Sequence, residues 1–138
     1  MKPNSFPRKE RLRRKNIIDH LFRQGNRISQ YPLTLIWCEA DLPEEVPVQV
    51  MFAVSKKKVR KAWKRNRIRR QMREAWRLNR HQLAEKVESS DGQIAVSVIY
   101  GDSELPDYQK LEAKIILALQ RLQEEYEKTH RQFDDRAD

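Results

Sequence analysis

Residues 48–76 read VQVMFAVSKKKVRKAWKRNRIRRQMREAW, and this run contains both a strand pattern and the start of a helix. In residues 48–55, Val48, Val50, Phe52 and Val54 lie on one face and Met51 and Ala53 on the other, which predicts a strand. From about residue 62 the spacing of the apolar residues becomes helical and stays so to residue 87. We therefore predict a helix over residues 62–87 whose buried stripe comprises Ile68, Met72, Ala75, Trp76, Leu83 and Val87.

The segments on either side of this helix predict a small sheet. Residues 93–100 alternate as a strand after the turn signal at residues 89–92, so strand, helix and strand can form a parallel βαβ crossover. Residues 28–39 also read as a strand, with apolar side chains on both faces from Leu33 onwards. We expect this strand to pair with residues 48–55 as an antiparallel hairpin across the loop of residues 41–47.

The two ends of the chain complete an α+β architecture. Residues 1–14 are basic and contain prolines, which favours an extended arm, and residues 107–131 predict a final amphipathic helix followed by a frayed tail at residues 132–138. A short helix at residues 16–23 is expected to end at Gly25 in the left-handed conformation. The predicted fold is a single domain, residues 1–138, in which helices pack on a small mixed β-sheet in the order α-β-β-α-β-α.

The short helix carries more apolar surface than its length requires. Ile17 and Leu21 form one row at i, i+4 spacing, and Ile18 and Phe22 form a second row beside it. One row suffices to anchor so short a helix. The second row therefore either widens the contact with the core or lines a groove.

The charge of the chain is unevenly distributed. It carries 29 Lys and Arg against 20 Asp and Glu, a net charge of +9, but residues 81–138 hold only 7 of those cations and 13 of those acids. Residues 56–80 hold 13 cations and a single acid, Glu74. Such a segment repels itself in the free protein, which favours a polyanionic partner such as RNA over a merely solvated charged face. Within it, Asn66 can accept a hydrogen bond from an Arg or a ribose hydroxyl, and the simplest partner for Glu74 is Arg70 or Arg77.

Several other classes of function find no support in the sequence. His20, His81 and His130 lie in separate elements and read as surface residues, and no Gly-rich phosphate loop or hydrolase motif occurs. We accordingly expect no catalytic residue and no metal site in the protein itself. The single cysteine, Cys38, reads as a buried thiol in a reducing compartment, so a cytoplasmic protein is expected, with neither a membrane nor a small-molecule partner.

Two motifs resemble the bacterial ribonuclease P protein component. Lys56-Lys57 after a strand, then Arg65-Asn66-Arg67-Ile68-Arg69-Arg70 and Arg73-Glu74, resembles the signature on the long central helix of that family. Arg11-Leu12, followed by Phe22 and Gly25, resembles the family's N-terminal motif. The resemblance covers roughly residues 6–127.

The resemblance implies a ribonucleoprotein enzyme in which the RNA subunit is the catalyst. The family's RNA removes the 5′ leader of precursor tRNA with Mg²⁺ held mainly by RNA, and the protein binds that RNA and the leader. The competing interpretation is a structural RNA-binding protein of ribosomal type. The resemblance also implies a fold like the second domain of ribosomal protein S5 with a left-handed βαβ crossover, where general rules favour the right-handed one.

The resemblance implies two groups of site residues. The contacts with the catalytic RNA would fall on Lys58, Arg60, Lys61, Lys64, Arg65, Asn66, Arg67, Arg69, Arg70 and Arg73. The leader groove would be lined by Ile18, Phe22, Ile36, Ser55, Lys56 and Lys57. Relatives often have an aromatic residue at the position of Ile18, and some have Tyr at the position of Ile36, so Phe22 is the expected stacking residue here.

Overall fold

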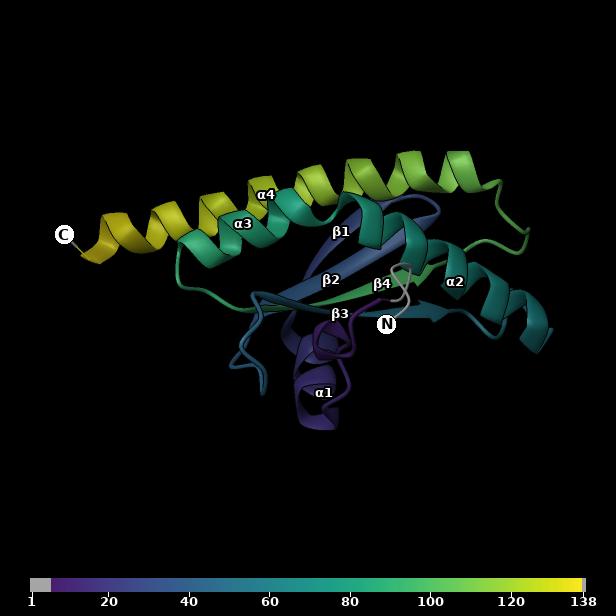
Figure 1. Ribbon diagram of the computed structural model, residues 1–138, viewed down its shortest axis with the longest axis horizontal. Coiled ribbons are helices and arrows are strands. Elements are labelled where there is room, and N and C mark those ends of the chain that lie inside the picture. The colour runs from purple at the N-terminus through teal and green to yellow at the C-terminus, as the bar shows by residue number, and fades with distance from the viewer. Residues whose placement is uncertain (1–5, 138) are drawn as a thin grey trace.

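The computed structural model describes the backbone of residues 6–137 and the side chains of residues 6–129. A four-stranded sheet lies between two helical layers, with α2, α3 and α4 on one face and α1 on the other (Figure 1). In spatial order its strands are β1 (Asn26–Gln30), β2 (Leu33–Glu39), β4 (Ile94–Tyr100) and β3 (Val48–Val54). The helices are the 3-10 turn η1 (Arg8–Glu10), α1 (Lys15–Gln24), α2 (Ala62–Asn79), α3 (His81–Ser89) and α4 (Tyr108–Ala137).

The pairing of the strands confirms the crossover and contradicts the hairpin. β3 and β4 are parallel neighbours joined through α2 and α3, as predicted, whereas β2 pairs antiparallel with β4 and not with β3. The antiparallel partner of β2 on its other side is β1, a strand that the prediction merged with β2. β4 takes the central position because its side chains are buried on both faces of the sheet. The left-handed sense of the crossover stays a prediction from the family resemblance.

β2 is covered on both faces, as its sequence predicts. Leu33, Leu35 and Trp37 belong to the large core beneath α2, α3 and α4. Ile36 and Cys38 belong to a smaller core beneath α1, together with Leu12, Leu21 and Ala95. Cys38 is buried as predicted, and this burial raises the pKa of its thiol, with a smaller contribution from Glu39.

The predicted long helix is interrupted at Arg80, which separates α2 from α3. The side chain of Asn79 donates to the Ala75 carbonyl oxygen at 2.8 Å, and the Arg80 guanidinium donates to the Arg77 carbonyl oxygen. Both carbonyls lie near the C-terminal end of α2, where side-chain donors commonly supplement the backbone hydrogen bonds. Leu83 and Val87 are nevertheless buried as predicted, because α3 continues the apolar stripe over the same core.

The N-terminal segment is not a free extended arm. Arg11 forms an isolated parallel bridge with Val50 in the edge strand β3, and the Leu12 N–H donates to the Val50 carbonyl oxygen at 3.0 Å. Phe6 and Leu12 are buried, in the large and the small core respectively. The segment covers part of an edge that would otherwise present unpaired backbone groups. Residues 1–5 of the predicted arm lie outside the described part of the chain.

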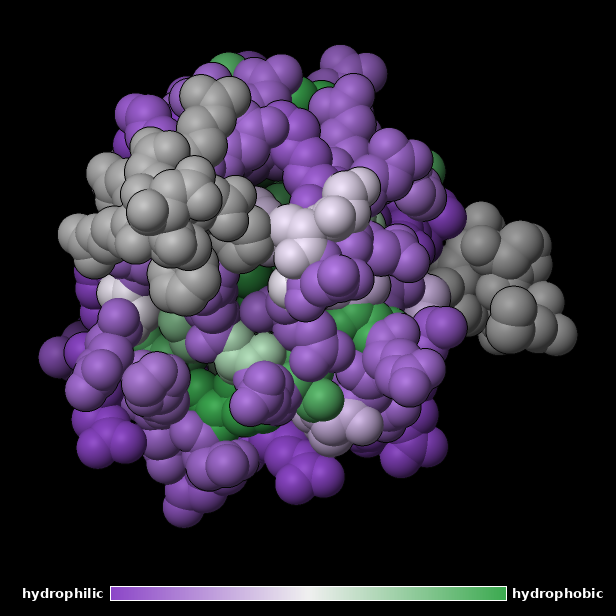
Figure 2. Space-filling view, turned by 90° about the vertical axis from the view of Figure 1, so that its left-hand side faces the viewer, coloured by the Kyte–Doolittle hydropathy of each residue, from purple (hydrophilic) through white to green (hydrophobic). Residues whose placement is uncertain are grey.

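The C-terminal helix is longer than predicted. α4 continues to Ala137, so helical backbone includes most of residues 132–138, the segment that was expected to be frayed. No helix in the described part of the chain is long and apolar enough to cross a membrane. The end of the molecule that faces left in Figure 1 is mostly hydrophilic, and its hydrophobic areas lie between hydrophilic side chains (Figure 2).

Gly25 ends α1 as predicted, but in an extended conformation with φ −70° and ψ 156° and not in the left-handed one. Its role is therefore steric. A Cβ at this position would lie 2.5 Å from Ile36 Cγ2 and against the Leu21 carbonyl oxygen. The absence of a side chain lets the end of α1 approach β2 closely.

Gly25→Ala should therefore destabilise the protein. The added methyl group forces α1 away from β2, and overpacking of this kind costs about 1–3 kcal/mol of unfolding free energy. Urea denaturation of both proteins measures the loss. Gly101→Ala is the matched control, because the nearest atom to its Cβ, the Pro32 carbonyl oxygen, is 3.6 Å away. Equal stability of Gly25→Ala and the original protein would contradict the steric role.

Candidate nucleic-acid interface

The basic surface begins in the loop between β3 and α2. Lys56, Lys57 and Lys58 are exposed, and Val59 is buried and anchors the loop to the core. The backbone of this loop is held by Ser55, whose carbonyl oxygen accepts from the Val59 N–H at 3.0 Å. The Lys58 ammonium donates to the Gly101 carbonyl oxygen at 2.7 Å. Lys56 and Lys57 are thus presented to solvent by a fixed loop.

Some of the predicted contact residues on α2 have roles within the protein. Arg65 is half-buried and donates to the carbonyl oxygens of Val59 and Arg60, at 2.9 and 2.8 Å. It closes the start of α2, where Lys61 provides no side-chain cap. Asn66 accepts a hydrogen bond from Arg69, which confirms the first of its two predicted roles. Arg65 is therefore the predicted RNA contact with the clearest structural role.

Further along α2, guanidinium groups crowd together without compensating acids. Burial lowers the pKa of Arg73, and repulsion from Arg11, Arg69 and Arg70 lowers it further. In the described part of the chain, Arg67, Arg70 and Arg73 form no ion pair. We call Arg11, Arg69, Arg70 and Arg73 the arginine cluster.

Arg11 is a site residue that the sequence prediction missed. It is exposed, lies in the segment that bridges to β3 and belongs electrostatically to the arginines of α2. The Arg11-Leu12 motif was the available signal. In the sequence this motif indicates the family, but it does not show that Arg11 adds its charge to the basic surface of α2.

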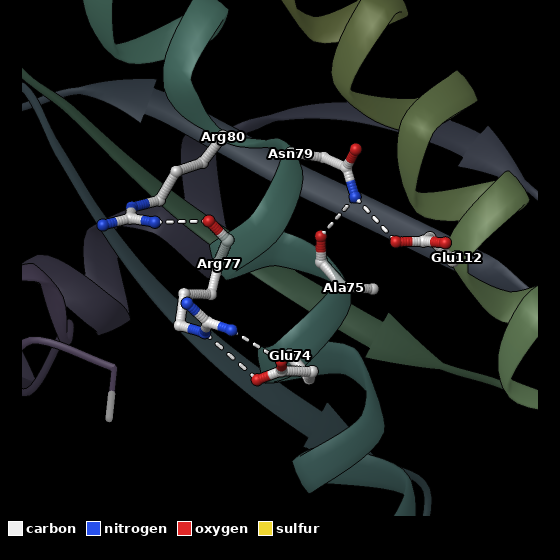
Figure 3. Close-up of polar contacts among 6 residues, drawn as sticks. All are labelled: Glu74, Ala75, Arg77, Asn79, Arg80 and Glu112. Atoms are coloured by element: carbon white, nitrogen blue, oxygen red, sulfur yellow. Dashed lines mark hydrogen bonds and ion pairs between the residues drawn. The ribbon is translucent and has the colours of Figure 1, made fainter. Parts of the chain in front are cut away.

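The basic surface ends where α2 meets α4 (Figure 3). Glu74 binds Arg77 in a bidentate pair, with distances of 3.1 Å to Nε and 2.7 Å to Nη2, so Arg77 and not Arg70 is its partner. This pair lowers the pKa of Glu74 and raises that of Arg77. One turn later, the Asn79 amide donates to Glu112 of α4 at 3.2 Å. Among the described side chains, acids therefore engage only the last turns of α2.

A second surface lies beside α1. Phe22 is 38% exposed and belongs to neither core, whereas Ile17 and Ile18 are half-buried against the small core. The two residues of the second apolar row of α1 thus have different roles. Ile18 widens the contact with the small core, and Phe22 faces solvent. Ile36 is fully buried beneath α1, so its placement in the groove is wrong.

The sheet next to α1 provides other residues in place of Ile36. Thr34, Ile99 and Ala53 stand side by side in the register of β2, β4 and β3, and all three are half-buried. They lie on the sheet face that carries Ile36, because alternate residues of a strand share a face. Ser55, half-buried, follows β3 two residues after Ala53. The alternation of Met51 and Ala53 away from the large core was the sequence signal for this open strip.

The titratable side chains do not assemble a metal centre within the described residues. His20 and His81 are exposed, as predicted, while the side chain of His130 lies outside the described residues. No group of three or more His, Cys, Asp or Glu side chains with the arrangement of a metal site occurs among those that are described. The exposed lysines before α2 and the arginines along it that form no ion pair among the described residues favour binding of a polyanion.

The fold and these two surfaces define an α+β protein of the nucleic-acid-binding class. The family described as Ribonuclease P matches residues 6–123. The ribonuclease P protein component of Chlorobaculum tepidum is 36% identical over 129 residues, covering 86% of this chain and 83% of that protein. The corresponding protein of Porphyromonas gingivalis is 30% identical over 113 residues, covering 82% of each chain. This chain belongs to the ribonuclease P protein family.

Solved structures agree with this fold. The ribonuclease P protein of Thermotoga maritima superposes with a TM-score of 0.64 at 20% identity, covering 81% of this chain and 96% of that one. The Staphylococcus aureus protein gives a TM-score of 0.61 at 18% identity, with 82% and 94% covered. The fold is therefore shared at low sequence identity.

Replacement of an arginine in the cluster should stabilise the free protein. Arg70→Gln removes one of the repelling charges from an exposed position, and like-charge pairs of this kind cost about 0.2–0.5 kcal/mol. The unfolding free energy should rise in low salt, and the difference should vanish at about 1 M salt, where the screening length is about 3 Å. Urea titrations at the two ionic strengths measure it. Lys128→Gln in α4 is the control and should not stabilise; equal effects of the two substitutions would contradict the repulsion.

Proposed function

We propose that this protein is the RNA-binding subunit of ribonuclease P and that α2 binds the catalytic RNA. The observation that carries the proposal is the arginine cluster, in which the charges of Arg11, Arg69 and Arg70 act on Arg73 and, among the described residues, no ion pair neutralises any of the four. Arg67, about one turn before Arg70, adds a further exposed cation. Phosphate oxygens supply the charge that the protein lacks here, and the planar guanidinium binds them in pairs.

We place the single-stranded 5′ leader of precursor tRNA on the surface beside α1. Phe22 supplies an exposed aromatic ring, and Thr34, Ala53 and Ile99 supply a floor without charge. Lys56 and Lys57, after Ser55, add cations at the end of β3. An extended strand needs this combination, because its bases stack on aromatic rings while its phosphates are neutralised. Ile18 contributes through its half-buried side chain, and Ile36 is excluded by its burial.

We infer that the catalyst is the RNA and that Mg²⁺ is bound mainly through it. Mg²⁺ prefers oxygen ligands and retains several of its waters, and the phosphates of a folded RNA supply such ligands. The contribution of the protein is positive charge and positioning. It lowers the repulsion between the catalytic RNA and its tRNA substrate, which matters most when the metal concentration is low.

Cleavage of precursor tRNA at low Mg²⁺ concentration tests this function. The protein alone should leave the substrate intact, a bacterial ribonuclease P RNA alone should cleave it slowly, and the two together should give the mature 5′ end rapidly. Gel analysis of a 5′-labelled substrate measures the three rates. Cleavage by rigorously RNA-free protein, or no acceleration by the protein, would contradict the proposal.

Phe22→Ala tests the leader surface. Loss of one stacked base weakens precursor binding by about 1–3 kcal/mol and should leave the binding of mature tRNA unchanged. Because Phe22 is already 38% exposed, the melting temperature should change little. Affinities of the holoenzyme for both RNAs measure the difference, and Tyr31→Ala, at a residue 67% exposed, is the control for loss of an exposed aromatic. Equal weakening for both RNAs would reject the groove.

A further inference from the structure

Trp63 is the exposed tryptophan of the described chain. Its side chain is 54% exposed, whereas Trp37 and Trp76 are each 1% exposed within the large core. Trp63 belongs to neither core. Exposure of so large an apolar surface costs solvation free energy that a small polar residue at this position would avoid. The Trp63 side chain therefore does not contribute to either hydrophobic core.

The surroundings of Trp63 are cationic. It lies in the first turn of α2, and the Lys64 ammonium is 5.7 Å from its ring centroid, within the range of a cation–π interaction. Arg67 and Arg70 follow at i+4 and i+7, so they share a helix face with Trp63. Ile68, on the buried stripe, lies on another face of the helix. The ring is thus presented beside the arginines that contact RNA in the proposed function.

We propose that Trp63 stacks on an unpaired base of the catalytic RNA. The inference rests on the proposed function and adds a contact of a different kind to it. Every base has a π-face, so stacking on an indole needs no particular sequence, while neighbouring cations hold the adjoining phosphates. A base within an RNA helix is already stacked on its neighbours, so the partner is a base in a loop, a bulge or a strand end. The catalytic RNA is favoured over the leader because Trp63 shares its face with Arg67 and Arg70.

Binding of three variants to the catalytic RNA tests the proposal. Trp63→Ala should weaken binding by about 5- to 150-fold, the effect of losing one stacked base. Trp63→Phe keeps a flat ring and should retain most of the affinity, whereas Trp63→Leu keeps apolar volume without a flat ring and should bind like Trp63→Ala. Leu78→Ala is the matched control on the same helix, at a residue 48% exposed. Unchanged melting temperatures would show that every variant is folded.

The salt dependence of binding separates stacking from phosphate contact. A neutral side chain releases no counterion, so Trp63→Ala should leave the slope of log K against log salt unchanged. Arg70→Gln should reduce the magnitude of that slope by about 0.7–0.9, the effect of one lost phosphate contact. A changed slope in Trp63→Ala, or equal affinities of the Leu and Phe variants, would overturn the stacking contact.

Intrinsic fluorescence gives an independent readout. The catalytic RNA should quench the emission of the original protein, and Trp63→Phe should remove that quenching because Trp37 and Trp76 are buried. If the RNA binds the original protein tightly but Trp63→Ala binds equally well, the stacking inference is wrong and the proposed function stands. If the original protein does not bind the catalytic RNA, the proposed function itself fails. Quenching by precursor tRNA and not by the catalytic RNA would overturn the choice of partner.

Discussion

The parallel pairing of β3 with β4 is the constraint on which the arrangement depends. Parallel neighbours require a connection that returns along the sheet, and here α2 and α3 provide it. The return places one stripe of α2 against the core, where Ile68, Met72 and Trp76 are buried. Arginines at intervening positions must then face outwards or sideways. The same pairing that forms the core therefore fixes a row of cations on a rigid helix.

The basic and acidic parts of the sequence are also separated in space, because among the described residues α4 contacts α2 through acidic side chains only near the C-terminal end of α2. α4 covers the large core, and its carboxylates reach α2 near the end of that helix, through Asn79 and Glu112. Glu74 is already occupied by Arg77. The turns of α2 before Glu74 thus keep their repulsion, which adds to the effect of burial in lowering the pKa of Arg73. Burial of the apolar stripe of α2 offsets the cost of this repulsion in the free protein, and binding of RNA phosphates would remove it.

The sequence predicted the features that depend on local periodicity and missed those that depend on partners distant in the chain. The strand at residues 48–55, the buried stripe from Ile68 to Val87 and the parallel crossover followed from alternation and helical spacing. The false hairpin arose because β2 and β3 are consecutive in the chain, whereas the pairing places β4, which is buried on both faces, between them. At the helix break at Arg80, the Asn79 and Arg80 side chains donate to carbonyl oxygens of α2, and such hydrogen bonds do not appear in an apolar pattern.

The candidate site also contains residues that the local sequence predicts and residues that depend on contacts distant in the chain. The basic helix was predictable because a dense run of Arg and Lys is a property of composition, but Arg11 joins the cluster only through the pairing of its segment with β3. Ile36 was misplaced because family position does not report whether a neighbouring helix covers a strand, and Gly25 brings α1 directly onto that residue. That close approach also sets the limit of the covered area. α1 packs over Ile36, Cys38 and Ala95, so the sheet beyond it, at Ala53 and Ile99, stays partly accessible. The steric freedom of a single glycine therefore helps to determine where an RNA strand can lie on the sheet.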